Sequence, residues 1–240
     1  MEKRKIRTPF FSVNPKAYIY GNTSVALAKF TDQMAEKYDI DVFYTGQHVD
    51  LARIKNETKH VIVTAQHMDG LVPGRGMGHI LPEALKAAGV EAVFLNHAEH
   101  PLTINQLARA ISRADELGIL TIVCADTAEE AKAIAQLKPD VMVCEPTSLI
   151  GTGKVSGEEY VHLTNEAVKS ISPDTLVLQA AGIRSGKNVF DVIMWGADGT
   201  GCTSGIVAAQ DPFKACEEMM QAVQEAKKSW QEGNRENENI

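Results

Sequence analysis

A lysine, a histidine and a glutamate each stand at or just beyond the end of a separate short apolar run in this sequence. They are Lys16, His97 and Glu145. If an amine, an imidazole and a carboxylate meet in one place, they can move a proton beside a carbonyl group, with the glutamate as the base. Each has a plainer interpretation alone, with Glu145 as an ion-pair partner of Lys16 and His97 as a helix cap. Burying all three would carry a desolvation penalty without structural gain, so together they favour a proton-transfer site.

The elements that must position these residues follow from an alternating pattern along the chain. Short runs rich in Val, Ile and Phe predict buried parallel strands, and segments of helical period between them predict helices. The predicted strands are residues 10–14, 41–45, 60–65, 92–96, 120–124, 141–145, 176–180 and 199–202. The predicted helices are residues 23–38, 49–56, 80–88, 102–117, 127–136, 157–172, 187–195 and 212–230. Eight such units predict an α/β fold, a single-domain (β/α)₈ barrel, in which chemistry gathers at the C-terminal ends of the strands.

Length and composition agree with one domain. The chain has 240 residues, 44% of them hydrophobic and 23% charged, and no linker-like stretch divides it, so it can form one large core. We assign residues 1–230 to the barrel and expect the polar tail, residues 231–240, to be disordered.

Charge and cysteine content exclude several classes of protein. The formal net charge is -7 and the positive charges are spread along the chain, which argues against a nucleic-acid partner. The apolar stretch at residues 9–13 is too short for a signal peptide or a membrane span. Four cysteines without CxxC spacing are expected to be reduced thiols. We therefore expect a cytoplasmic protein without a membrane partner.

Glycine-rich turns follow the last three predicted strands. Gly151, Gly182 and Gly205 lie in these turns, where backbone N–H groups near a helix start favour an anion. A phosphate group fits such a place. A metal-dependent barrel is the alternative, because His67, His79 and the run from His97 to His100 offer imidazoles at ligand-like spacing. The charge of Lys16 nearby would repel a divalent ion, so we expect no metal.

These motifs together resemble the triosephosphate isomerase family, and within it the short archaeal-type branch. They span nearly the whole chain in the expected order. The matching segments are residues 14–16, 65–69, 78–84, 96–100, 145–153 and 181–183. The resemblance implies a TIM barrel that interconverts dihydroxyacetone phosphate and D-glyceraldehyde 3-phosphate through an enediolate, without metal or organic cofactor.

The resemblance also implies residue roles. Glu145 matches the base, His97 the neutral imidazole that polarises the carbonyl, and Lys16 the stabilising cation, an arrangement for which this family is the standard example. Asn14 matches the asparagine that orients these groups, and residues 146–153 match a mobile lid. With Asn14 and Lys16, the residues that contact the sugar phosphate would be Ile150, Gly151, Gly182, Thr203, Ser204 and Gly205. The segment 67–79 would insert into a neighbouring subunit, which implies a homodimer or a homotetramer.

Four positions depart from the family pattern. Pro15 replaces an aromatic residue, Ala98 a serine, Ala180 a glycine, and Arg184 a small polar residue. These departures leave open a paralogue that isomerises another short sugar phosphate, such as a tetrulose phosphate. A catalytically dead phosphate sensor is a second alternative, but such a sensor would not need the base.

Overall fold

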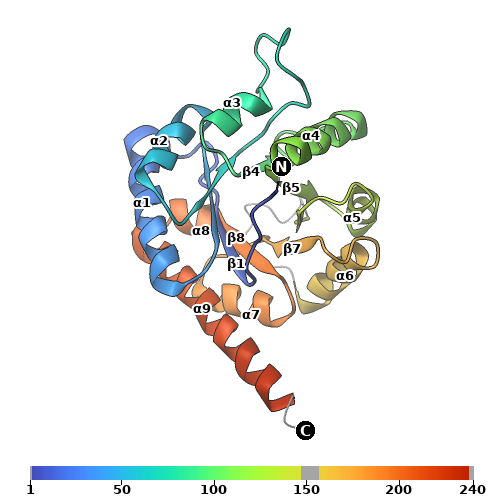
Figure 1. Ribbon diagram of the computed structural model, residues 1–240. Helices are drawn as coiled ribbons and strands as arrows, with labels where there is room; N and C mark the ends of the chain where they lie inside the picture. The colour runs from blue at the N-terminus through green and yellow to red at the C-terminus, as the bar shows by residue number, and fades with distance from the viewer. Residues whose placement is uncertain (1, 147–156, 238–240) are drawn as a thin grey trace.

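Eight parallel strands close into a barrel in the computed structural model of this protein, which describes residues 2–146 and 157–237. The strands pair in sequence order, and the first pairs with the last (Figure 1). They are β1 (Phe10–Val13), β2 (Val42–Gly46), β3 (Ile62–Ala65), β4 (Ala92–Leu95), β5 (Leu120–Ala125), β6 (Val141–Cys144), β7 (Leu176–Gln179) and β8 (Gly199–Cys202). The single-domain (β/α)₈ TIM barrel predicted from the sequence is thereby confirmed.

Helices surround the barrel, as their apolar stripes require. They are α1 (Gly21–Tyr38), the short 3₁₀ helix η1 (His48–Asp50), α2 (Leu51–Glu57), α3 (Pro82–Ala87), α4 (Ile104–Leu117), α5 (Ala128–Ala135), α6 (Glu158–Lys169), α7 (Gly186–Met194), α8 (Ser204–Val207) and α9 (Pro212–Asn237). Within the described residues, no helix is long and apolar enough to cross a membrane.

The C-terminal part of the chain differs from the prediction in two places. Helix α9 continues to Asn237, so residues 231–237, which were expected to be a disordered tail, form its last turns. Residues 231–237 carry no apolar stripe, so the hydrophobic pattern did not predict that the helix continues. Helix α8 was missed because its four residues are too few to show a helical period.

Two hydrophobic layers hold the barrel together. Side chains alternate along each strand, so one set fills the interior and the other packs beneath the helices. The interior set includes Phe10, Phe43, Ile122 and Leu178, while the outer set includes Phe11 and Tyr44. Because Phe10, Ser12 and Asn14 share the inner face, the C-terminal end of β1 aims its polar residues into the barrel mouth.

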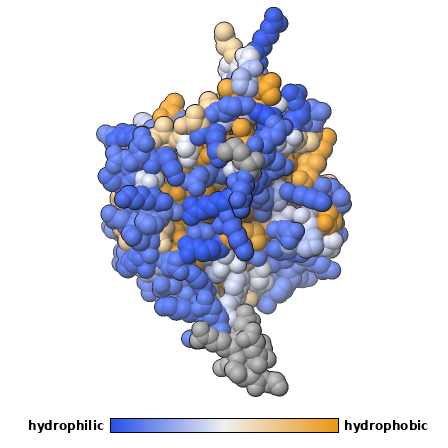
Figure 2. Space-filling model, viewed as in Figure 1, coloured by the Kyte–Doolittle hydropathy of each residue, from blue (hydrophilic) through white to orange (hydrophobic). Residues whose placement is uncertain are grey.

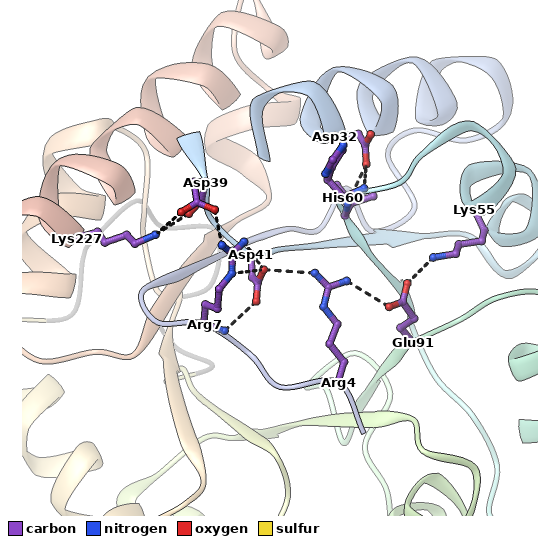
Figure 3. A network of polar contacts seen from close by, with 10 residues as sticks. Arg4, Arg7, Asp32, Asp39, Asp41, Lys55, His60, Glu91 and Lys227 are labelled. Atoms are coloured by element: carbon purple, nitrogen blue, oxygen red, sulfur yellow. Dashed lines mark hydrogen bonds and ion pairs between the residues drawn. The ribbon is translucent and has the colours of Figure 1, made fainter. Parts of the chain in front are cut away.

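The N-terminal segment closes the opposite end of the barrel through ion pairs (Figure 3). Arg7 donates to Asp39 and Asp41, and Arg4 contacts Asp41 and Glu91. Asp41 and Glu91 come immediately before β2 and β4. This network therefore belongs to the end of the barrel that carries stability, leaving the other end free for chemistry.

Candidate active site

A cavity of about 290 Å³ opens among residues at and beyond the C-terminal ends of the strands. Its lower wall is formed by barrel residues that include Phe94, Val143, Leu178 and Gly201. Its polar lining combines Asn14, Lys16, His97, Glu99, Glu145, Gly182, Thr203 and Ser204. The barrel therefore brings residues predicted from separate strands into one cavity.

Lys16 has a strained backbone that its neighbours hold in place. Its φ of 48° is left-handed, a conformation that non-glycine residues adopt only when surrounding structure fixes it. Asn14 Oδ1 accepts a hydrogen bond from the Lys16 N–H at 3.0 Å. The Lys16 carbonyl accepts from Gln66 Nε2 at 2.8 Å and from Gln47 Nε2 at 3.2 Å. Side chains after β1, β2 and β3 thus fix the direction in which the lysine leaves the backbone.

The Lys16 ammonium is held between the cavity and a carboxylate. Its Nζ lies 2.6 Å from Glu99 Oε1, and its side chain is 17% exposed while that of Glu99 is 63% exposed. The hydrogen bond from Lys16 lowers the pKa of Glu99, so this carboxylate stays ionised. Glu99 thus holds the half-buried cation in its position from the solvent side.

His97 is set in one tautomer by the turn that follows it. The backbone N–H of Glu99 donates to His97 Nδ1 at 3.1 Å, so in the neutral ring the proton sits on Nε2. Burial lowers the pKa of His97, and the charge of Lys16 lowers it further against a smaller opposing effect of Glu99. His97 is therefore a neutral hydrogen-bond donor at physiological pH.

Glu145 follows the buried strand β6 and lines the same cavity. Its backbone N–H donates to the Ala125 carbonyl at 3.1 Å, which fixes it against β5. Burial raises the pKa of Glu145, Lys16 opposes the increase, and Glu99 adds to it. A carboxylate with a raised pKa beside a neutral imidazole donor is suited to general base catalysis.

The turns after β7 and β8 pack directly against each other. Gly182 has a φ of 73°, a conformation that glycine adopts without strain. At Gly205, a Cβ atom would lie 2.8 Å from the Ile183 carbonyl oxygen and 2.7 Å from Cys202 Sγ, so the two turns can touch only through glycine. Gly182, Thr203 and Ser204 line the cavity as a result.

Most of the predicted site residues meet in this cavity, with three exceptions. Gly205 lies behind the lining, where it allows the two turns to touch, and Ile150 and Gly151 lie outside the described residues, as does nearly all of the predicted lid. Arg184 is exposed and is absent from the cavity lining. No group of three or more histidine, cysteine or acidic side chains in the described part of the chain is arranged to hold a metal ion.

The sequence prediction missed three residues that shape the site. Glu99 lies within the run from His97 to His100, but its pairing with Lys16 was not foreseen. Gln47 and Gln66 act on the Lys16 carbonyl, and Gln47 Nε2 also donates to Gln66 Oε1 at 3.2 Å. The signal for Gln47 and Gln66 is their place just beyond the ends of β2 and β3, beside the unusual backbone of Lys16.

Comparisons with known proteins match the part of the chain that forms the barrel and the cavity. A family model described as triosephosphate isomerase matches residues 9–223, which include every strand and every residue of the cavity lining. The triosephosphate isomerase of Methanobacterium bryantii is 36% identical over 213 residues, 87% of this chain and 94% of that protein. That of Methanocaldococcus jannaschii is 36% identical over 216 residues, 88% and 98% of the two chains. That of Sulfolobus acidocaldarius is 32% identical over 219 residues, 90% and 95% of the two chains.

Proposed function

The chain belongs to the triosephosphate isomerase family, and from this premise we propose how its own residues carry out the reaction. A triosephosphate isomerase interconverts dihydroxyacetone phosphate and D-glyceraldehyde 3-phosphate, an aldose–ketose isomerisation. The reaction needs a base that reaches a carbon beside a carbonyl, a donor to the carbonyl oxygen, and a place for the phosphate. The single observation that carries our assignment is the enclosure of Glu145, His97 and Lys16 in one cavity.

In the proposed mechanism, the Glu145 carboxylate removes a proton from the carbon next to the carbonyl and returns it to the former carbonyl carbon. His97 passes its Nε2 proton to the oxygen on which negative charge develops and takes up the proton of the neighbouring hydroxyl, so that hydroxyl and carbonyl exchange carbons, while the Lys16 ammonium stabilises the enediolate. The raised pKa of Glu145 makes its carboxylate a stronger base. Because the cavity is lined partly by apolar side chains, these charges act with less screening than in water.

A stable mimic of the enediolate tests this placement. We expect 2-phosphoglycolate to bind with its phosphate against Gly182 and Ser204 and its carboxylate between His97 and Glu145. Since two carboxylates would then face each other, binding is expected to favour protonated Glu145 and to weaken as pH rises. A crystal structure of the complex and calorimetric titration at several pH values measure both.

Two variants separate the proposed site from general anion binding. Glu145→Gln should remove part of the pH dependence, because its amide needs no proton to face the ligand. Arg53→Ser is the matched control and should leave the affinity unchanged, because Arg53 is exposed on α2, bonds to Asn22 and does not line the cavity. A phosphate found elsewhere, for example beside His79, would contradict the assignment.

We also propose that the functional unit is a homo-oligomer, at least a dimer. The segment between β3 and α3 projects from the barrel at the top of Figures 1 and 2. On it, Val72 is 59% exposed and Met77 is 102% exposed. A second cavity of about 300 Å³ lies beside the first and is lined by residues that include Lys16, His97 and Glu99. An apolar segment from a second copy could fill this cavity and shield the Lys16–Glu99 pair from water.

Light scattering of the purified protein tests the oligomer. We expect a dimer or a tetramer for the wild type, and a monomer with reduced kcat for Met77→Asp, because a charge on the projecting segment opposes its burial. Lys138→Asp is the matched control. Lys138 is exposed and follows α5, outside the projecting segment, so this variant should keep the molar mass of the wild-type oligomer. A wild-type monomer with full activity would contradict this proposal.

For location we propose the cytoplasm, where the family's sugar phosphate substrates are dissolved.

A further inference from the structure

A buried serine hydroxyl in the lower wall of the catalytic cavity has no part in the proposed mechanism. Ser12 is 3% exposed and lines this cavity. Within residues 2–146 and 157–237, its Oγ has no hydrogen-bond partner. By contrast, the hydroxyl of Thr64 on β3 donates to the Ile62 carbonyl at 2.8 Å. Because a buried hydroxyl without a partner costs free energy, Ser12 requires a partner that enters through the cavity.

The strand pattern directs Ser12 into this cavity. Phe10 belongs to the barrel interior, whereas Phe11 and Val13 pack beneath the helices. Alternate residues of a strand share a face, so Ser12 points inward, one layer below Asn14. Two residues of a strand span about 6.6 Å. Ser12 therefore lies deeper in the barrel than the groups that hold the reacting carbons.

The neighbouring strand has no side chain beside Ser12. Gly201 of β8 pairs with Ser12 in register and also lines the cavity. A Cβ atom at Gly201 would lie 2.8 Å from both the Cβ and the carbonyl oxygen of Ser12, so a larger residue would displace β1. The lower wall also includes the apolar side chains of Phe94, Val143 and Leu178. An unpaired hydroxyl in a largely apolar wall suits a short carbon chain that carries one hydroxyl group.

The oxygens of a triose phosphate are all engaged elsewhere in the proposed mechanism. Those of the two reacting carbons face His97 and Lys16, and the phosphate lies against Gly182 and Ser204. No oxygen of that substrate therefore remains for Ser12. A fourth carbon, attached to the reacting carbon that is farther from the phosphate, would bring one more hydroxyl into the cavity.

We propose that Ser12 binds this additional hydroxyl, so that the protein also isomerises a four-carbon sugar phosphate. The inference rests on the proposed function, because it uses the same base, donor and cation. In a tetrulose 1-phosphate, the carbonyl carbon and the neighbouring hydroxyl-bearing carbon form the reacting pair. Transfer of the proton between these carbons, with exchange of hydroxyl and carbonyl, gives a tetrulose 4-phosphate. Substrate and product are both ketoses, so the reaction needs no oxidant or reductant.

The test compares kcat/KM for glyceraldehyde 3-phosphate and for tetrulose 1-phosphate in the wild type and Ser12→Ala. Phosphorus-31 NMR should show that the wild type forms tetrulose 4-phosphate. In heavy water, deuterium should enter at the carbon that receives the proton. Alanine removes the hydroxyl without filling its space. Ser12→Ala should therefore lower the ratio of four-carbon to three-carbon kcat/KM about tenfold, through the loss of one hydrogen bond.

Thr45→Val is the matched control. Thr45 on β2 is also fully buried, and its Oγ1 also has no hydrogen-bond partner in the described part of the chain. Thr45 does not line the catalytic cavity, however. The substrate ratio of Thr45→Val should therefore equal that of the wild type. A loss of the ratio in both variants would show a general effect on the barrel and would overturn the role of Ser12.

The remaining outcomes separate this inference from the proposed function. Turnover of glyceraldehyde 3-phosphate without turnover of tetrulose 1-phosphate would overturn the inference and leave the proposed function standing. An unchanged substrate ratio in Ser12→Ala would also overturn it, because Ser12 would then bind water only. Absence of glyceraldehyde 3-phosphate turnover in the wild type would instead overturn the proposed function.

Discussion

Glu145→Gln is expected to lower kcat by about 10² to 10⁴-fold while changing KM little, because glutamine fills the same space but cannot accept the proton. The substitution should also raise the melting temperature at neutral pH. Folding raises the pKa of Glu145 through burial, so ionising this group disfavours the folded state above that pKa. The neutral amide removes this penalty. Coupled assays with glyceraldehyde 3-phosphate and thermal denaturation at the same pH measure the two effects.

Glu145→Asp tests the position of the base separately from its chemistry. It keeps a carboxylate but withdraws it by about one methylene, and a displacement of roughly 1 Å can lower the rate about 10²-fold. We therefore expect a large loss of kcat with KM again nearly constant. If either variant kept the wild-type kcat, Glu145 would not be the base.

The barrel was predictable because each of its strands has a local signal in the sequence. Continuous apolar runs identify strands that are buried on both faces, as at β6, Val141–Cys144, whose predicted range was residues 141–145. The predicted start of α5 also holds, since Thr127 accepts a hydrogen bond from the Glu130 N–H. Short or solvated elements give no such signal, so α8 and the end of α9 were missed.

The site was predictable only in part, for a different physical reason. Residues such as His97 and Glu145 follow strands directly, so the closed barrel brings them together whatever the loops do. The contacts of Lys16 with Glu99, Gln47 and Gln66 depend on the exact path of the four loops after β1, β2, β3 and β4 and on a left-handed backbone at Lys16. No local pattern encodes that path.

Lys16→Met is expected to lower kcat/KM by about 10² to 10³-fold, because the ammonium stabilises both the bound phosphate ester and the charge that develops in the enediolate. KM should rise as kcat falls. Methionine keeps the length of the side chain without its charge, and the carboxylate left behind on Glu99 is 63% exposed, so the folded state should lose little stability. Steady-state kinetics and thermal denaturation of the same preparation measure these effects.

Glu99→Gln distinguishes catalysis from ion pairing. If Lys16 mattered only as the partner of Glu99, both single variants would lose the same activity; we expect Glu99→Gln to lose only a few-fold. The pH profile provides the sharper distinction. Lys16 lowers the pKa of both His97 and Glu145, so removing its charge should raise both values. The acid limb of the kcat/KM profile of Lys16→Met should therefore move to higher pH, because both groups become protonated sooner. An acid limb that stayed in place would show that the Lys16 charge does not act on these two groups.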